Sequence, residues 1–332
     1  MFLWLGFLVS AAAIVFCGAR LSRYGDIIAE KTGLGRTWIG ILMMASVTSL
    51  PELMTGISAV TYVDAPDIAV GDVLGSCVFN LLILASLDVA EREKPISTRA
   101  QQGHVLSAGF GILLLSLVGV SLFRREGISP FGWIGFYSLL TVAIYLLAIR
   151  LVYFYEKRQI ARFIGQRAEE FRYKNVQLKS ALINYGWNAL VVVGAAVLLP
   201  RFGAGIAEAT GLGQTFVGNI FVAIVTSLPE VVVSVAAVKI GAIDLAIANL
   251  LGSNLFNILI LAIDDAFFLP GPILSHVDSS HVLSALAAIA MTSIAIIGLT
   301  YQAERKLLRM SWDSLAMVFV FIANLMLLYM YK

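Results

Sequence analysis

Two glutamates, Glu52 and Glu230, each close the same pentapeptide, Thr-Ser-Leu-Pro-Glu, at residues 48–52 and 226–230. Both copies lie in long apolar runs, where a charged side chain costs at least about 2.5–3.5 kcal/mol on membrane-insertion scales. The carboxylate and the two hydroxyls are hard oxygen donors, which suit sodium or calcium better than transition metals. The pattern predicts a cation site with one carboxylate from each copy. The alternatives are a protonated glutamate hydrogen-bonded to a neighbouring helix, or a glutamate at a helix end that reaches the lipid headgroups.

A second repeated segment adds neutral donors, because Gly-Ser-x-x-Phe-Asn occupies residues 75–80 and 252–257. Its serine and asparagine are four residues apart and therefore share one helix face. With the glutamates, the candidate ligands are Thr48, Thr226, Ser49, Ser227, Ser76, Ser253, Asn80 and Asn257. Calcium takes about six to eight oxygen ligands, and two carboxylates would neutralise one divalent ion.

A proline precedes each glutamate, as Pro51 and Pro229. Proline has no N–H, so the carbonyls of Val47 and Val225 lose their usual helical partner and the helix is expected to break. Broken helices present carbonyls to cations in transporters, and unwound backbone is tolerated at membrane depth where it lines a cavity. One proline alone would indicate a packing kink, whereas its recurrence favours an ion site.

The similarity between the halves extends beyond these motifs. Asp67 corresponds to Asp244 and His104 to His281, with an offset of 178 residues before Asp67 and 177 from there on. Each copy covers five apolar runs, and an odd number of spans turns the second copy upside down, a common plan of secondary transporters. We therefore predict a first repeat at 1–155, a linker at 156–180 and an inverted second repeat at 181–332.

The composition requires lipid as the solvent, because 59% of the 332 residues are hydrophobic and 13% are charged. The predicted fold class is an all-α polytopic membrane protein with ten transmembrane helices in two inverted five-helix repeats, broken at the ion site. The ten apolar runs lie near 2–19, 37–61, 67–88, 104–123, 131–153, 181–200, 214–238, 244–263, 281–300 and 312–331.

The basic linker predicts the orientation. Residues 156–179 carry seven lysines and arginines against three glutamates, and cytoplasmic loops are enriched in Lys and Arg. With ten spans, both termini then lie outside. We expect an integral protein of the cell (inner) membrane.

Other residues suggest no cofactor and no enzyme. Nucleotide-binding glycine motifs are absent from the sequence, and both cysteines lie in apolar runs. His104 and His281 fall near span ends on opposite sides, where they form no nucleophile–base pair and are expected to be interfacial. Asp72 lies four residues before Ser76; we expect a solvated span end there, with a guard of the external entrance as the alternative.

The segments ASVTSLPEL (45–53) with GSCVFN and AIVTSLPEV (223–231) with GSNLFN resemble the calcium/cation antiporter superfamily, and most of all the prokaryotic sodium/calcium exchangers. The resemblance implies that the two glutamates bind calcium and share in sodium binding, with the hydroxyls listed above as further ligands. It also implies backbone carbonyl ligands for sodium at Ala45 and Ala223, and it matches Asn80 to the family's asparagine.

Two departures bear on the coupling ion. Asn257 stands where potassium-dependent relatives carry aspartate, which leans against potassium use, and the chain lacks the GNxxE motif usual in proton/calcium exchangers. The predicted function is therefore sodium/calcium exchange by alternating access. The resemblance implies that the first and sixth spans, at 2–19 and 181–200, slide past the rest. A proton-coupled antiporter for calcium or another cation is the runner-up, and a cation channel is a third possibility. The expected partners are calcium and sodium ions and the lipid bilayer, without nucleic acid, and a monomer is compatible with the sequence.

Overall fold

The computed structural model describes residues 2–32, 46–90, 95–98, 100, 103–124, 132–163, 176–239, 241–302, 306–307 and 309–331. Within these ranges the secondary structure is helical, apart from one isolated β-bridge between Leu307 and Met310. Helices satisfy their own backbone hydrogen bonds, as a chain in lipid requires. The all-α part of the predicted fold class is therefore confirmed.

Eight helices in the described ranges are long and apolar enough to cross a membrane. They are α1 (Phe2–Thr32), α4 (Pro66–Ala90), α5 (Gly103–Arg124), α6 (Phe136–Phe163), α7 (Leu178–Thr210), α11 (Ile243–Phe267), α12 (His281–Tyr301) and α13 (Trp312–Met330). A bent pair, Gln214–Thr226 followed by Leu228–Lys239, forms a ninth candidate span with an angle of 44° between its parts.

The remaining elements are short and include the segments around the two glutamates. In the first half, residues 46–48 are helical and are followed by α3 (Leu50–Ser58) and the π-helical η1 (Ala59–Val63). The second half has α8 (Gln214–Phe216), the π-helical η3 (Val217–Val222), α9 (Ala223–Thr226) and α10 (Leu228–Lys239). Two 3₁₀ turns are η2 (Ile96–Thr98) and η4 (Ile273–Ser275). The predicted span at 37–61 begins outside the described residues, so ten spans and their inversion stay predictions.

Three of the predicted apolar runs were wrong at their ends. α1 continues to Thr32, α6 to Phe163, and α7 covers Leu178–Thr210 with Pro200 inside it. An apolar run marks the part of a helix that suits hydrocarbon, whereas the helix itself can continue into polar surroundings. Helices therefore cover both ends of the segment that the sequence indicated as a linker.

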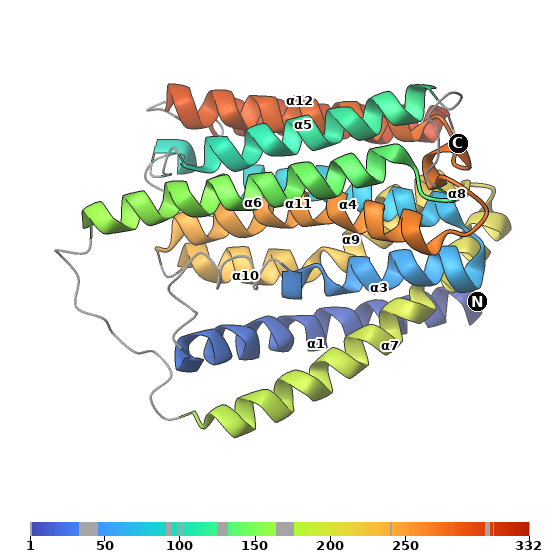
Figure 1. Cartoon of the computed structure of the whole chain (residues 1–332), viewed down its shortest axis with the longest axis horizontal. Coiled ribbons are helices and arrows are strands. Elements are labelled where there is room, and N and C mark those ends of the chain that lie inside the picture. Colours follow the sequence, from blue (N-terminus) through green and yellow to red (C-terminus); the bar gives the residue numbers. More distant parts are fainter. Residues whose placement is uncertain are drawn as a thin grey trace.

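The two most buried of these spans, α4 and α11, contact each other at the centre of the bundle. Helices α5 and α12 pack together on one side and α1 and α7 on the other (Figure 1). Both chain termini lie at one end, here named the terminal face. α6 ends and α7 begins at the opposite end, here named the linker face (Figure 1).

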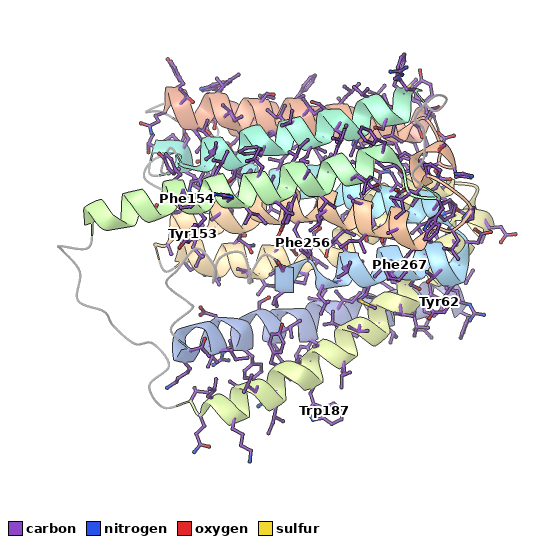
Figure 2. The ribbon with its side chains drawn as sticks, viewed as in Figure 1. Tyr62, Tyr153, Phe154, Trp187, Phe256 and Phe267 are labelled. Carbon is purple, nitrogen blue, oxygen red and sulfur yellow. The ribbon has the colours of Figure 1, made fainter. Side chains whose placement is uncertain are left out.

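The outer surface is apolar along its length. Trp187 on α7 points away from the bundle, and aromatic side chains lie toward both ends, with Tyr62 and Phe267 near the terminal face and Tyr153 and Phe154 toward the linker face (Figure 2). Trp187 is 66% exposed and Tyr62 81% exposed. Exposed apolar surface of this extent fits a lipid environment, with aromatic rings toward its boundaries.

Candidate cation-binding site

Both glutamates lie in the first turn of a short helix that begins directly after a break in helical geometry. The backbone leaves helical geometry at Ser49 (φ −87°, ψ 14°) and at Ser227 (φ −86°, ψ 5°), and α3 and α10 start at the next residue. A proline in the first turn costs little, because an N–H there has no partner within the helix. The predicted break before each glutamate is therefore confirmed, and it lies on the serine between the threonine and the Leu-Pro-Glu segment.

Each glutamate accepts a hydrogen bond from the opposite half of the chain. The hydroxyl of Ser227 donates to Oε1 of Glu52 over 3.1 Å, and that of Ser49 donates to Oε1 of Glu230 over 3.2 Å. Ser253 donates a second bond to Oε1 of Glu230, also over 3.2 Å. The two pentapeptides therefore meet, and each orients the carboxylate of the other.

The threonine of each pentapeptide contacts the serine of the Gly-Ser-x-x-Phe-Asn motif from the opposite half of the chain. Thr48 Oγ1 lies 3.3 Å from Ser253 Oγ, and Thr226 Oγ1 lies 3.4 Å from Ser76 Oγ. These contacts join the pentapeptides to the central helices α4 and α11. Gly75 permits close approach on α4, because a Cβ there would collide with the backbone carbonyl of Asn219 on η3.

The second oxygens of the two carboxylates are available for a ligand. Oε2 of Glu52 and Oε2 of Glu230 are buried without a hydrogen-bond partner, and the two charges lie close enough to interact. An unpaired carboxylate in an apolar interior is costly, whereas a bound cation supplies the missing charge. No three Asp, Glu, His or Cys side chains in the described ranges are grouped to hold a metal. Any cation here therefore depends on hydroxyl, amide and carbonyl oxygens as well.

The asparagines differ in how they are used. Asn80 donates through Nδ2 to Oδ1 of Asn254 over 3.0 Å and leaves its own Oδ1 without a partner. Neither Oδ1 nor Nδ2 of Asn257 makes a hydrogen bond, and the thiol of Cys77 is a near neighbour. Asn254, which the sequence showed only as the counterpart of Cys77, therefore belongs to the packing of this site.

The structure places the described candidate ligands together in the interior. Each is fully buried: Thr48, Ser49, Glu52, Ser76, Asn80, Ala223, Thr226, Ser227, Glu230, Ser253 and Asn257. The carbonyl of Ala223 accepts bonds from the Ser227 N–H at 3.1 Å and from Thr226 Oγ1 at 3.2 Å. Ala45 lies outside the described residues.

Asp72 is not a solvated span end, so that prediction was wrong. Its side chain is fully buried, and Oδ1 accepts a bond from Thr226 Oγ1 over 2.7 Å. A position one helical turn from Ser76, on a helix buried on all sides, faces the interior. The sequence gives no sign that Asp72 lies in the interior, because its counterpart in the second half, Asn249, is neutral.

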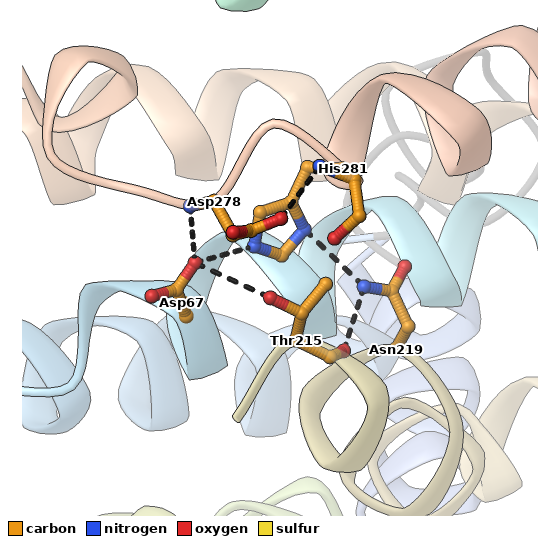
Figure 3. A network of polar contacts seen from close by, with 6 residues as sticks. Asp67, Thr215, Asn219, Asp278 and His281 are labelled. Carbon is orange, nitrogen blue, oxygen red and sulfur yellow. Dashed lines mark hydrogen bonds and ion pairs between the residues drawn. The ribbon is translucent and has the colours of Figure 1, made fainter. Parts of the chain in front are cut away.

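The two histidines are buried at the starts of α5 and α12, where they lie at helix ends as expected. His281 Nε2 lies 3.0 Å from Oδ1 of Asp67, and His104 Nε2 lies 3.0 Å from Oδ1 of Asp244. Each histidine therefore contacts the aspartate of the opposite half. Figure 3 shows the first of these networks, in which Asp67 also accepts a bond from Thr215 Oγ1 over 3.4 Å.

A further symmetric pair was missed, although the sequence carries its signal. Asp-x₆-Pro-Ile occurs at residues 88–96 and again at 265–273, within the repeat offset of 177. Asp88 accepts bonds from the backbone N–H groups of Ile96 and Ser311, and Asp265 accepts bonds from those of Ile273 and Gly135. These aspartates anchor the segments that follow α4 and α11, and they do not belong to the ion site.

Comparison with known proteins identifies the family. The family described as "Sodium/calcium exchanger protein" matches residues 2–154 and 181–330. The chain belongs to this family. It is therefore an integral membrane cation antiporter of the sodium/calcium exchanger family and not an enzyme.

Two curated members of similar length illustrate the relationship. The sodium/calcium exchanger MaX1 of Methanosarcina acetivorans is 26% identical over 340 residues, which cover 91% of each chain. The inner membrane protein YrbG of Escherichia coli K12 is 26% identical over 277 residues, which cover 80% of each chain.

Two solved structures share the fold of this chain. YfkE superimposes with a TM-score of 0.68 at 17% identity, covering 98% of this chain and 92% of its own. The sodium-calcium exchanger NCX_Mj, soaked with Na⁺ and Sr²⁺, gives a TM-score of 0.61 at 19% identity over 97% of both chains. At this identity the likeness concerns the fold alone.

Proposed function

We propose that this exchanger moves sodium against calcium by alternating access, with Glu52 and Glu230 holding the ion. The observation that carries the proposal is the pair of buried, unpartnered Oε2 atoms, one from each half of the chain. Two carboxylates balance the charge of one Ca²⁺, and the surrounding hydroxyl and amide oxygens can complete a flexible shell of about six to eight ligands.

The same charges explain why exchange would be obligatory. Without a cation, Glu52 and Glu230 repel each other in an environment of low dielectric constant, which opposes passage through an occluded state. Calcium or sodium removes that penalty, so only a loaded protein switches sides. The proposed ligands are the eleven fully buried candidates named above together with the carbonyl of Ala45.

The packing supports sliding of α1 and α7. These helices lie side by side at the edge of the bundle (Figure 1), and a Cβ at Gly18 of α1 would lie 2.7 Å from Cγ of Pro229. Because Pro229 directly precedes Glu230, movement of α1 would change the packing around Glu230. The positive-inside rule further supports an inner-membrane orientation with residues 156–179 in the cytoplasm and both termini outside.

Proton coupling is the second candidate. Asp72 and Asp264 are two additional fully buried carboxyl groups, each with at least one oxygen that lacks a hydrogen-bond partner. Such groups can carry protons as well as cations. A protonophore separates the candidates, because it abolishes proton-driven calcium uptake and leaves sodium-driven uptake unchanged.

The decisive experiment is calcium uptake into sodium-loaded proteoliposomes. Wild-type protein should accumulate calcium when sodium leaves the vesicle, with or without a protonophore. Glu52→Gln and Glu230→Gln should each abolish uptake. Glu208→Gln is the matched control, because Glu208 on α7 is exposed whereas Glu52 and Glu230 are fully buried. Retained uptake in both site variants, or uptake without any counter-ion, would overturn the proposal; the second result would indicate a channel.

A further inference from the structure

A third acidic side chain approaches the helix face that carries Glu52. Asp264 on α11 is fully buried, and neither of its carboxylate oxygens has a hydrogen-bond partner. A Cβ at Gly56 would collide with this carboxylate, so Asp264 occupies the space that a side chain at Gly56 would fill. Since Gly56 lies one turn after Glu52 on the same face of α3, Asp264 extends the acidic lining beyond the central pair.

Asp72 supplies a second carboxylate in the same region. Its Oδ1 accepts a bond from Thr226 over 2.7 Å, whereas its Oδ2 is buried without a partner. The charge of Asp72 interacts with those of Asp264, Glu52 and Glu230. These two buried carboxylates with open oxygens are therefore close enough for their charges to interact with each other and with the central pair.

The two acids break the symmetry of the repeat. The offset of 177 pairs Asp72 with Asn249 and Asp264 with Leu87, and the offset of 178 pairs Gly56 with Ser234. In the second half Asn249 donates to the hydroxyl of Ser234 over 3.3 Å, and both side chains are neutral. The acidic set therefore occurs on one side of the central site, and its counterpart positions hold neutral residues.

The acidic side is the one toward the terminal face. Asp264 lies three residues before the end of α11 at Phe267, and Phe267 lies near the terminal face together with Tyr62 (Figure 2). Asp72 lies six residues after the start of α4 at Pro66, and two residues separate Pro66 from the π-helical segment that contains Tyr62. A cation that moves between the terminal face and Glu52 would pass these carboxylates.

We propose that Asp72 and Asp264 form a second calcium-binding position between Glu52/Glu230 and the terminal face, which loads the exchanger from that side. This inference rests on the proposed function of the central pair. Two unpaired buried carboxylates favour a divalent cation of hard character, and the hydroxyl of Thr226, already bonded to Asp72, connects this position to the central one. The neutral counterparts provide no such position toward the linker face.

Equilibrium binding of radiolabelled calcium to the detergent-purified full chain tests the proposal. In the Glu52→Gln/Glu230→Gln background the central position is disabled, and residual calcium binding should remain. Adding Asp72→Asn or Asp264→Leu should weaken that residual binding at least tenfold. Both replacements copy the residue that the repeat carries at the counterpart position. Asn249→Ala is the matched control on the opposite side and should leave residual binding unchanged.

Absence of residual binding in the double variant, or residual binding that Asp72→Asn leaves intact, would overturn the second position. Gel-filtration profiles identify variants that fail to fold; if Asp264→Leu fails, Asp72→Asn alone decides, because Asn249 shows that the fold accepts asparagine there. Failure of the central proposal is a separate result, since it appears as calcium transport that persists in Glu52→Gln and Glu230→Gln.

A transport measurement that compares the two faces of the protein gives a second test. In wild-type background, Asp72→Asn should raise the calcium concentration for half-maximal exchange about tenfold when calcium is applied at the terminal face. It should change little when calcium is applied at the linker face. Right-side-out and inside-out membrane vesicles present the two faces separately, and an equal change at both faces would contradict loading from one side.

Discussion

The hydroxyl of Ser227 donates to Oε1 of Glu52 over 3.1 Å, so the second half of the chain orients the carboxylate of the first. Ser49 reciprocates by donating to Oε1 of Glu230 over 3.2 Å. The proposed ligand set is therefore complete only where the two halves meet. Any movement of one half relative to the other changes both contacts, which links ion binding to conformation.

These two hydrogen bonds predict unequal effects of serine removal. Glu230 keeps the bond from Ser253 when Ser49 is replaced, whereas Glu52 loses its one side-chain donor described here when Ser227 is replaced. A hydrogen bond to a charged group is worth about 1.5–3 kcal/mol, or roughly 10- to 100-fold in affinity. Ser227→Ala should therefore raise the calcium concentration for half-maximal uptake by about that factor, and Ser49→Ala by less.

Proteoliposome uptake as a function of calcium concentration measures both variants. The exposed Ser275, whose hydroxyl bonds the carbonyl of Pro272, gives Ser275→Ala as a control that should match wild type. An effect of Ser49→Ala that equals or exceeds that of Ser227→Ala would contradict this account of how the carboxylates are oriented.

The break at Ser227 predicts a cost for restoring a continuous helix. Pro229→Ala returns the N–H that can bond the carbonyl of Val225, which favours joining α9 to α10 across their 44° bend. We expect the maximal exchange rate to fall at least about tenfold, while thermal stability stays equal or rises. Pro66→Ala at the start of α4 is the control. A Pro229→Ala protein with the wild-type rate would show that the bend is dispensable.

The repeated motifs were sufficient to predict that Glu52, Glu230 and the neighbouring oxygen donors come together in the interior. The same residues recurred in both halves, and in a membrane the recurrence of Glu52 and Glu230 had few explanations other than a ligand. The contacts between Ser227 and Glu52 were not predictable, because sequence spacing describes one helix face and not the partner helix. Helix ends such as Thr32 were missed because the apolar run stops before the helix does.

Asp72 and Asp264 show the limit of arguing from a repeat. Their counterparts are Asn249 and Leu87, so the repeat did not mark these two aspartates as candidate ligands. Their burial depends on packing between α3, α4 and α11, which no local pattern encodes. Asp88 and Asp265 are the opposite case, because their shared Asp-x₆-Pro-Ile segment was visible in the sequence but suggested no chemistry until its hydrogen bonds were seen.

Asp265 is predicted to support stability and not ion binding. Its carboxylate accepts bonds from Tyr137 at 2.6 Å, Ser138 at 2.6 Å and the N–H of Ile273 at 2.7 Å. Asparagine would place an NH₂ group among these donors and leave buried groups unsatisfied, at about 1–3 kcal/mol. Asp265→Asn should lower the thermal unfolding temperature with calcium affinity unchanged in the folded fraction.

The control for this prediction is Asp64→Asn. Asp64 is exposed, and its φ of 53° is one that asparagine adopts readily. Thermal unfolding followed by gel filtration should give the wild-type temperature for this variant. An Asp265→Asn protein that unfolds at the wild-type temperature would show that the anchored loops contribute little.

Asn257 predicts exchange without potassium. Potassium-dependent members of the superfamily carry aspartate at the matching position, whereas this chain places a neutral amide there, fully buried. Sodium-driven calcium uptake should therefore be the same when potassium is replaced by choline on both sides of the vesicle. A strict requirement for potassium would mean that another residue supplies the missing charge.

Asn257→Asp should convert this neutral position into a third central carboxylate. Neither polar atom of Asn257 makes a hydrogen bond, so the substitution breaks none and adds a charge beside Cys77 and the glutamates. Near an effective dielectric constant of about 20, an added negative charge about 4 Å from a cation contributes about 4 kcal/mol per unit of cation charge. Calcium should then bind at least about tenfold more tightly and be released more slowly, which lowers the maximal exchange rate.

Asn80→Asp provides the contrast, because Asn80 donates a hydrogen bond to Asn254 over 3.0 Å and the substitution removes that bond. Equilibrium calcium binding and initial uptake rates on both variants distinguish added charge from lost packing; equal affinities for the two variants would contradict the different roles assigned to these asparagines.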